Sequence, residues 1–365
     1  MKKEVISNKQ VKLLIFSYCI GAYLLFNMGS DVKQDVWISS VIAIGCSIPV
    51  VIMYGRIIDL YPRKNFFDIL EELFGKIFGK AFSMLFIFHT AFLATYILRD
   101  FADFVKVTTL FYTPLVVPMI CIGVLSIWIL NEGVEVLVSW AKFLIRLILI
   151  AMVVIWIMLI PEMHVSNLQP IFYMDFKVIL KQAFLLISFP FTEVIVFLNF
   201  FDYVEHNENT KNVFVTPLIL GGILVILYTM INIMILGGEV YSLFYYPGYE
   251  SIKRLRLGGE FQRIEIIVSI AFTIIQFLEI NFCILGVSKG ITKVLNLKDY
   301  RKALIPVVVL AIIVSDIMFK SSMEAFEIVK RFWPIYGFIM QTILPLIIFI
   351  VASIKNKKKK SNNKK

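Results

Sequence analysis

Charged residues are scarce in this sequence: Asp, Glu, Lys and Arg together make up only 17% of its 365 residues. A soluble globular chain carries about 25% charged and about 45–50% apolar residues, whereas the apolar share here is 59%. The low charge and the mean hydropathy of +0.84 exclude an ordinary soluble protein. They predict an integral membrane protein.

Cysteine and histidine are also rare, with four Cys and three His in the chain. The cysteines are scattered through apolar segments and none forms a CxxC pair, so we expect neither a disulfide framework nor a metal site. HExxH and Walker A are absent from the sequence, and neither GxSxG nor GxGxxG occurs in a soluble βαβ context. We therefore predict that the protein is not an enzyme and has no catalytic residues and no cofactor.

A membrane-spanning helix needs about 20 mostly apolar residues, and the sequence contains ten such segments. They are Val11–Met28, Val36–Tyr54, Ala81–Leu98, Pro114–Leu130, Phe143–Ile160, Val178–Phe201, Val213–Leu236, Ile264–Val287, Ala303–Phe319 and Trp333–Ile354. Five precede and five follow the loop at 161–170, so the second half crosses the membrane in the opposite sense to the first. We therefore predict an all-α integral membrane protein with ten transmembrane helices in a 5+5 inverted repeat. It forms a single domain over 1–354, with repeats at about 11–160 and 178–354.

Lys and Arg are nearly twice as frequent in the loops on the side of the N-terminus as in the opposite loops. Because cytoplasmic loops carry the excess of Lys and Arg, we expect both termini in the cytoplasm. The tail at 355–365 is basic and has no apolar residue, which predicts a disordered segment near anionic membrane lipids rather than nucleic acid. At 65–78, apolar residues at helical spacing predict a helix on the inner membrane surface.

Two of the ten segments contain residues that interrupt a helix. The first has Ser17, Tyr18 and Gly21 within it, and the sixth has Ser188 and Pro190. Backbone groups freed by a break at membrane depth are tolerated only inside the protein or along a watery cavity. Matched interruptions in the two halves are the best indication in a sequence of a transporter-like binding site.

The two breaks can hold the two ends of an α-amino acid. A half-helix beginning at Gly21 would point the positive end of its dipole at a carboxylate, and carbonyls freed at Pro190 would accept hydrogen bonds from an ammonium. Each break also has a purely structural interpretation. Gly21 can serve as a small packing face for a neighbouring helix, and Pro190 can produce a kink without function.

Ionisable residues inside a membrane span are costly and indicate function by default. Glu279 lies deep in the eighth segment, and Glu193 follows the break in the sixth. We therefore expect the ligand between segments one, three, six and eight. The predicted ligand-binding residues are Ser17, Tyr18, Gly21, Tyr23, Thr95, Ser188, Pro190, Phe191, Glu193 and Glu279. Arg99 and Arg263 lie at segment ends, where we expect them to serve assembly or stability.

Several short motifs follow one another along the chain as far as about Ile354. They are Ile6-Ser7-Asn8-Lys9-Gln10, Trp37, Tyr61-Pro62, Leu73-Phe74-Gly75-Lys76, Leu98-Arg99-Asp100-Phe101, Thr113-Pro114-Leu115, Ser188-Phe189-Pro190-Phe191-Thr192-Glu193 and Phe261-Gln262-Arg263-Ile264-Glu265. Their order and spacing resemble those of the B subunits of spore germinant receptors, which are relatives of the amino acid/polyamine/organocation transporters. The sequence departs from that pattern at Tyr23 and Met28, where the family commonly has Gly and Pro.

The resemblance implies a LeuT-like fold and a sensor of small nutrients, often amino acids, in the inner membrane of dormant spores. It further implies two partners, a membrane A subunit and a lipoprotein C subunit. Two other functions stay open at this point. One is a secondary amino-acid transporter, because transporters share this fold; the other is a structural membrane subunit whose pocket is altered by the bulky Tyr23.

Overall fold

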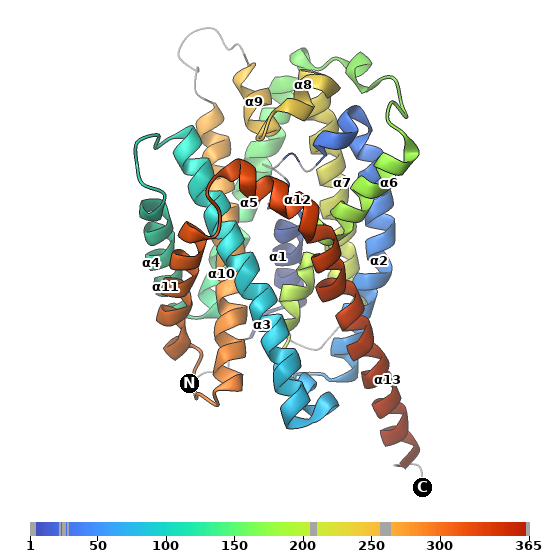
Figure 1. Ribbon diagram of the computed structural model, residues 1–365, viewed down its shortest axis with the longest axis vertical. Coiled ribbons are helices and arrows are strands. Elements are labelled where there is room, and N and C mark those ends of the chain that lie inside the picture. Colours follow the sequence, from blue (N-terminus) through green and yellow to red (C-terminus); the bar gives the residue numbers. More distant parts are fainter. Residues whose placement is uncertain are drawn as a thin grey trace.

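The computed structural model describes residues 5–21, 23, 27, 29–204, 210–255 and 264–362. Almost all of these residues lie in helices, most of which run along the long axis of an elongated bundle (Figure 1). The predicted all-α architecture is confirmed, and the apolar segments of the sequence account for its helices.

Eight of the ten predicted segments are single helices, and the sixth and tenth are composite. The single helices are α1 (Asn8–Gly21), α2 (Val36–Leu60), α3 (Phe66–Thr108), α4 (Val116–Glu132), α5 (Val134–Leu159), α7 (Thr210–Leu236), α10 (Glu265–Val294) and α11 (Arg301–Ile317). The sixth segment consists of α6 (Phe176–Leu186), the π-helix η5 (Ile187–Phe191) and the 3-10 helix η6 (Glu193–Phe200). The tenth consists of α12 (Ser322–Phe338), the π-helix η7 (Ile339–Ile343) and α13 (Leu344–Asn362).

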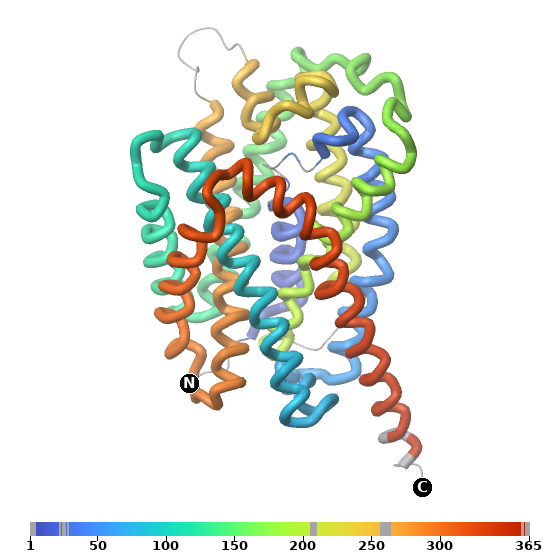
Figure 2. The backbone as a smooth tube through the Cα atoms, in the orientation of Figure 1, coloured from blue at the N-terminus to red at the C-terminus, as the bar shows by residue number. Residues whose placement is uncertain are grey.

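Seven helical stretches of the described residues are long and apolar enough to cross a membrane. The other three segments, α1, α4 and α11, have 14, 17 and 17 residues. Short helices connect the segments at one end of the bundle: η2 (Ser30–Asp35), η3 (Ile160–Glu162), η4 (Val165–Leu168), α8 (Gly238–Leu243) and α9 (Pro247–Lys253). Helix α1 begins and α13 ends toward the opposite end (Figure 2).

The burial of α5 follows the helical period. Ile148 and Ile155 are buried against the bundle, whereas Ile150 and Ile157 are 63% and 61% exposed. In water the exposed side chains would be unfavourable, but hydrocarbon tails solvate them as well as the protein interior does. This face of α5 therefore suits a lipid environment.

Helix α3 contains the segment predicted to lie on the inner membrane surface. Asn65 caps the helix by accepting a hydrogen bond from the N–H of Phe67 (2.9 Å), and the chain turns at Gly75, where φ is +78°. Glycine suits this position because other residues adopt positive φ only with strain. Phe67 and Ile69 are buried in the protein core. The predicted helix exists, but its apolar face is covered by protein and not only by lipid.

The structure differs from the sequence prediction at the basic tail. Helix α13 continues to Asn362 and therefore extends through most of the tail at 355–365, where we predicted a disordered segment. The run of Lys residues follows directly on an apolar helix, so the helix already present extends into it without a new nucleation step.

The sixth segment lies in the interior of the bundle. In the most apolar 18-residue stretch of this segment, 89% is buried inside the protein. In the corresponding stretch of the span that contains α5, the buried share is 22%. Helix α1 also lies at the centre of the bundle, surrounded by the other helices (Figures 1 and 2). The two segments with predicted breaks are therefore central, which is where a binding site can be enclosed.

Candidate functional site

The first predicted break lies where α1 ends at Gly21. Glu279 of α10 packs directly against this residue. A Cβ atom at Gly21 would overlap the carboxylate oxygen Oε1 of Glu279 and would lie 2.6 Å from Cγ2 of Ile275. Glycine is needed here because the missing side chain leaves the space that the carboxylate occupies. The half-helix that we expected after Gly21 lies mostly outside the described residues.

A second carboxylate lies close to the end of α1. The Tyr18 hydroxyl is 3.5 Å from the sulfur of Cys283, and both Glu193 and Glu279 are near enough to act electrostatically on these two groups. All four side chains are buried. The structure thus brings together four of the predicted ligand-binding residues, Tyr18, Gly21, Glu193 and Glu279.

Gln276 adds an uncharged polar group to this cluster. It precedes Glu279 by three residues, a spacing that places both side chains on one face of α10. Gln276 is fully buried, and neither of its amide atoms has a hydrogen-bond partner in the described part of the chain. Oε1 of Glu193 likewise has no hydrogen-bond partner among the described residues. Buried polar atoms of this kind are rare and costly, so they are candidates to contact a ligand.

The second predicted break lies in η5. Phe189 leaves the helical conformation (φ −145°, ψ 113°), and the Phe189–Pro190 peptide bond is cis. Ser188 Oγ donates to the carbonyl of Pro334 at 3.2 Å, and Trp333 Nε1 donates to the carbonyl of Ser188 at 3.2 Å. These polar groups therefore tie the break in the sixth segment to α12 in the tenth.

A chain of polar contacts continues from this break into η7. Thr192 Oγ1 donates to Oε1 of Gln341 at 2.6 Å, and Nε2 of Gln341 lies 3.5 Å from Nε2 of His89. Nδ1 of His89 lies 3.3 Å from the Tyr336 hydroxyl, and Tyr54 donates to the carbonyl of Thr192 at 3.2 Å. Sequence reasoning missed Gln341 and Tyr54. Gln341 could have been noticed, because it is a lone amide in the apolar tenth segment.

Three predicted residues have contacts outside this cluster. Ser17 Oγ donates to the carbonyl of Leu14 in its own helix, at 2.8 Å. The Tyr23 side chain is buried, and its hydroxyl lies toward Ser40 of α2 and Thr229 of α7. Phe191 is fully buried in the apolar core. Each of these residues packs within the protein, and their contacts by themselves indicate no ligand.

Thr95 lies in a different part of the bundle. It borders a groove of about 370 Å³ between α3, α10 and α11, whose lining is otherwise apolar. Its backbone carbonyl accepts a hydrogen bond from Ser315 of α11 at 2.8 Å. The structure does not bring Thr95 to the end of α1.

Arg99 is held entirely by protein groups. Its Nε lies 3.0 Å from Oδ2 of Asp103, and its Nη1 donates to the carbonyls of Ser315 and Asp316, each at 3.1 Å. The side chain is only 2% exposed. These contacts join α3 to the end of α11, which agrees with a structural role. Arg263, the other predicted structural residue, lies outside the described residues.

One end of the bundle is closed by Lys289 of α10. Its Nζ lies 2.6 Å from Oδ1 of Asp202 and 2.6 Å from the carbonyl of Asn199, and it lies over the ring of Tyr203 at 4.2 Å. The N–H of Ile6 donates to the carbonyl of Tyr203 at 2.8 Å. The chain after η6 is therefore fixed both to α10 and to the segment before α1.

The opposite end is covered by the connection between α7 and α10. Asn27 donates from its side chain to the carbonyl of Tyr241, and from its backbone to the carbonyl of Tyr245 at 3.2 Å. Burial and then the nearby Asp100 carboxylate raise the pKa of Tyr246 well above its usual value, so its hydroxyl stays protonated at physiological pH. The contacts of Asn27 thus join the chain after α1 to α8 and to the residues that follow it.

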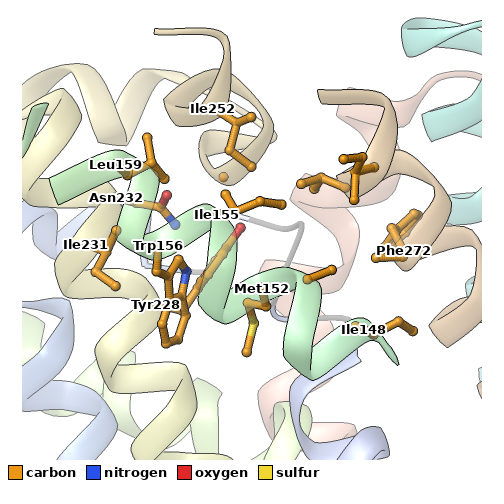
Figure 3. A pocket seen from close by; sticks show the side chains of 15 residues that line it. Ile148, Met152, Ile155, Trp156, Leu159, Tyr228, Ile231, Asn232, Ile252 and Phe272 are labelled. Atoms are coloured by element: carbon orange, nitrogen blue, oxygen red, sulfur yellow. The ribbon is translucent and has the colours of Figure 1, made fainter. Parts of the chain in front are cut away.

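A separate small cavity of about 60 Å³ lies between α5, α7, α9 and α10. Its lining is largely apolar, with Tyr228 and Asn232 as polar members (Figure 3). None of the predicted ligand-binding residues lines it. Ligand pockets commonly measure about 300–1,000 Å³, so this cavity is too small to hold a nutrient molecule.

The sequence matches the family described as spore germination protein over residues 5–324. Spore germination protein KB of Bacillus subtilis (strain 168) is 24% identical over 372 residues, covering 99% of this chain and 98% of that protein. The putative spore germination protein YfkT of the same organism is 21% identical and covers 90% of each chain.

Solved transporter structures share the fold. The nucleobase-cation-symport-1 family transporter MHP1, in a closed conformation with bromovinylhydantoin bound, has a TM-score of 0.68 at 11% identity, covering 98% of this chain and 94% of that one. A Na⁺-coupled sialic acid symporter has a TM-score of 0.66 at 15% identity, covering 95% and 80%. MhsT in complex with L-phenylalanine has a TM-score of 0.59 at 15% identity, covering 97% and 90%. These likenesses confirm the predicted LeuT-like fold class.

Proposed function

Because the chain belongs to the spore germination protein family, we propose that it is the nutrient-sensing membrane subunit of a spore germinant receptor. It binds a small solute, such as an amino acid, and triggers germination. The observation that carries this proposal is the meeting of Gly21 with Glu279 at the centre of the bundle. Burying a carboxylate at the end of a central helix costs free energy. A bound ligand that contacts the carboxylate can offset part of that cost.

The proposed ligand-binding residues are those around the end of α1, namely Tyr18, Gly21, Glu193 and Glu279. The break at Ser188 and Pro190 acts with them, because a segment interrupted at membrane depth can pivot there. Ligand contact at Glu193, which follows the break directly, would then change how the sixth segment packs on the tenth. This is the step by which binding would be passed on to the rest of a receptor.

The protein acts with a membrane A subunit and a lipoprotein C subunit, as the resemblance to receptor B subunits implies. It resides in the inner membrane of the spore with both termini in the cytoplasm, and its basic C-terminal end lies near anionic lipids. Residues 1–354 form one transmembrane domain with two inverted repeats. The family and fold are those of receptors and transporters, and we expect no enzymatic activity.

The second candidate function is a secondary amino-acid transporter. The observation in its favour is the fold, which the chain shares with symporters at TM-scores up to 0.68. Fold alone does not separate a sensor from a transporter. Family membership favours the sensor, since the curated relatives are germination proteins.

Spores that lack the gene test the proposal. We expect them to lose the response to at least one nutrient in a panel of amino acids and sugars, measured as the fall in optical density on germination, and to regain it when the gene is restored. Unchanged germination with every nutrient to which the parent strain responds would rule the sensor function out.

An uptake assay separates the two candidate functions. The purified protein is reconstituted into liposomes and given the radiolabelled nutrient identified with the deletion strain. We expect binding without accumulation inside the vesicles. Concentrative uptake driven by an ion gradient would instead establish the transporter.

A further inference from the structure

We propose that a groove between α6 and α12 binds the headgroup of an anionic glycerophospholipid such as phosphatidylglycerol, and that Lys181 and Arg331 hold its phosphodiester. The inference goes beyond the proposed function and does not depend on which solute the protein binds. It concerns the half of the bundle opposite the basic tail. Four features of the groove lead to it: its size, its charge, its position at the membrane surface and its contact with the break in the sixth segment.

The groove is large enough for a headgroup. Its volume is about 820 Å³, which lies within the usual range of about 300–1,000 Å³ for ligand sites. One wall is formed by α6 and the other by α12, and Asp31 of η2 also lines the groove. The apolar part of the lining includes Phe184, Leu185 and Ile335. The groove therefore offers both polar and apolar surface to one occupant.

The charged side chains of the groove leave two cations available. Lys181, Lys330 and Arg331 line it together with two carboxylates, those of Asp31 and Glu327. The ammonium of Lys330 is already paired with Asp31. Lys181, Arg331 and Glu327 take part in none of the ion pairs of the described chain. The lining thus carries one net positive charge, which the single negative charge of a phosphodiester balances.

The two available cations come from opposite walls, Lys181 from α6 and Arg331 from α12. A phosphodiester has oxygens on several sides and can accept hydrogen bonds from both at once. Arginine suits this contact because its planar guanidinium matches the geometry of phosphate oxygens, while lysine acts as a point charge. The chemistry of the lining therefore favours a phosphate group.

The groove lies where two segments enter the membrane. The predicted apolar segments begin at Val178 and Trp333, within three residues of Lys181 and Arg331. Long cationic side chains at such positions reach the level of the lipid headgroups. Ile335 follows Arg331 by one turn, lines the same groove and is 64% exposed. This order, cations followed by exposed apolar surface, is that of a phospholipid, whereas a free anion would leave the apolar wall unused.

A second groove at the same end of the bundle lacks these cations. It lies between the end of α3 and the start of α10 (Figure 1) and measures about 620 Å³. Of the described residues that line it, Glu265 is charged and none is Lys or Arg. A carboxylate repels a phosphodiester, because both are negative. The groove between α6 and α12 is thus distinguished by its charge and not by its size.

The groove also borders the contact between the sixth and tenth segments. Pro334 lines it, and the carbonyl of Pro334 accepts the hydrogen bond of Ser188 at 3.2 Å. The next turn of α12 is equally close, since a Cβ atom at Gly337 would lie 2.9 Å from Cβ of Ser188. A headgroup that bridges Lys181 and Arg331 would hold α6 and α12 together beside the break. We therefore expect the bound lipid to stabilise this packing.

A phosphatidylglycerol with a diazirine near its headgroup locates the site. It is added to the purified full-length protein in detergent and activated by light, and the labelled peptides are identified by mass spectrometry. We expect labels on α6 and α12, and few in the groove between α3 and α10. Unlabelled phosphatidylglycerol should suppress the labels on α6 and α12 at a concentration at least about fivefold lower than phosphatidylethanolamine does. Labels on the basic tail fall on different peptides and are counted separately.

Variants then assign the binding to the two cations. Lys181→Gln and Arg331→Gln should each raise the suppressing concentration about fivefold, the usual contribution of one Lys or Arg beside an anionic headgroup. Lys177→Gln is the matched control, because Lys177 lies one turn earlier in α6 and is not among the residues that line the groove. All three side chains are exposed, so we expect the variants to fold. Phosphatidylglycerol should raise the unfolding midpoint of the parent protein more than that of the double variant Lys181→Gln/Arg331→Gln.

Suppression by phosphatidylethanolamine at the same concentration as phosphatidylglycerol would overturn the assignment of an anionic lipid. Suppression by free glycerol phosphate at that concentration would show that the groove takes a soluble anion, and would overturn the lipid. Peptides of α6 and α12 without label, or an equal effect of Lys177→Gln, would show that the groove is not the site. Each of these outcomes leaves the proposed function intact, because that function is tested separately with spores that lack the gene.

Discussion

At the scale of single residues, Gly21 is the most restricted position of the candidate site. A methyl group there would overlap Glu279 and crowd Ile275. We expect Gly21→Ala to lower the free energy of unfolding by about 1–3 kcal/mol, the usual cost of overpacking, and to abolish the nutrient response. Thermal unfolding of the purified protein and germination assays measure the two effects.

The matched control is Gly45→Ala in α2, because a Cβ atom at Gly45 meets nothing within 4 Å. Alanine is the better helix former by up to about 1 kcal/mol, so this variant should be as stable as the parent or more stable. Equal behaviour of the two variants would contradict the close approach of Glu279 to α1.

Arg99 is the residue whose removal should cost most. Arg99→Ala leaves the Asp103 carboxylate buried without its cation, which costs about 3–5 kcal/mol in comparable cases. We expect the variant to be strongly depleted in spore membranes, as an immunoblot would show. The double variant Arg99→Ala/Asp103→Ala should recover part of the loss because it removes both charges. A normal amount of the single variant with a shifted nutrient dose-response would instead indicate a ligand contact.

At the scale of elements, the sixth and tenth segments are joined through their irregular parts. The π-helices η5 and η7 interrupt the two segments at Ile187–Phe191 and Ile339–Ile343, and Thr192 and Gln341 are hydrogen-bonded across them at 2.6 Å. Irregular turns of this kind are frequent at functional sites. We therefore expect a displacement of one segment to act on the other through this hydrogen bond.

Thr192→Val tests this connection. The substitution keeps the shape of the side chain but leaves Oε1 of Gln341 without its donor, and a buried unsatisfied group costs about 1–3 kcal/mol. We expect the unfolding midpoint to fall by an amount of that size and the nutrient response to change. Thr273→Val is the control, because within the described residues Thr273 Oγ1 donates to the carbonyl of Ser269 in its own helix, at 2.8 Å, and to no other group; an equal fall in both variants would argue against a special role for Thr192.

At the scale of the whole molecule, the inverted repeat requires both termini on one side of the membrane. We expect a cysteine at position 361, made as Ser361→Cys with Cys46 and Cys121 replaced by Ala, to resist a membrane-impermeant thiol reagent added outside sealed cells. Ser166→Cys in the connection between α5 and α6 should react, because Ser166 is exposed at the opposite end of the bundle. Labelling at 361 but not at 166 would reverse the topology.

The sequence by itself determined the class, the helices and the fold of this protein. Long apolar runs can only be satisfied as helices in lipid, because every backbone polar group must find a partner within its own segment. The same reasoning made Gly21, Pro190, Glu193 and Glu279 conspicuous, since each is unfavourable in an apolar helix unless something compensates it. Local chemistry is sufficient for such predictions.

Only the tertiary structure decided which of these residues meet. The sequence could not show that Glu279 fills the space beside Gly21, that Thr192 contacts Gln341, or that Thr95 lies away from the site, because these contacts join segments far apart in the chain. The ends of helices and the angles at which they pack set such distances, and spacing along a sequence carries no information about them.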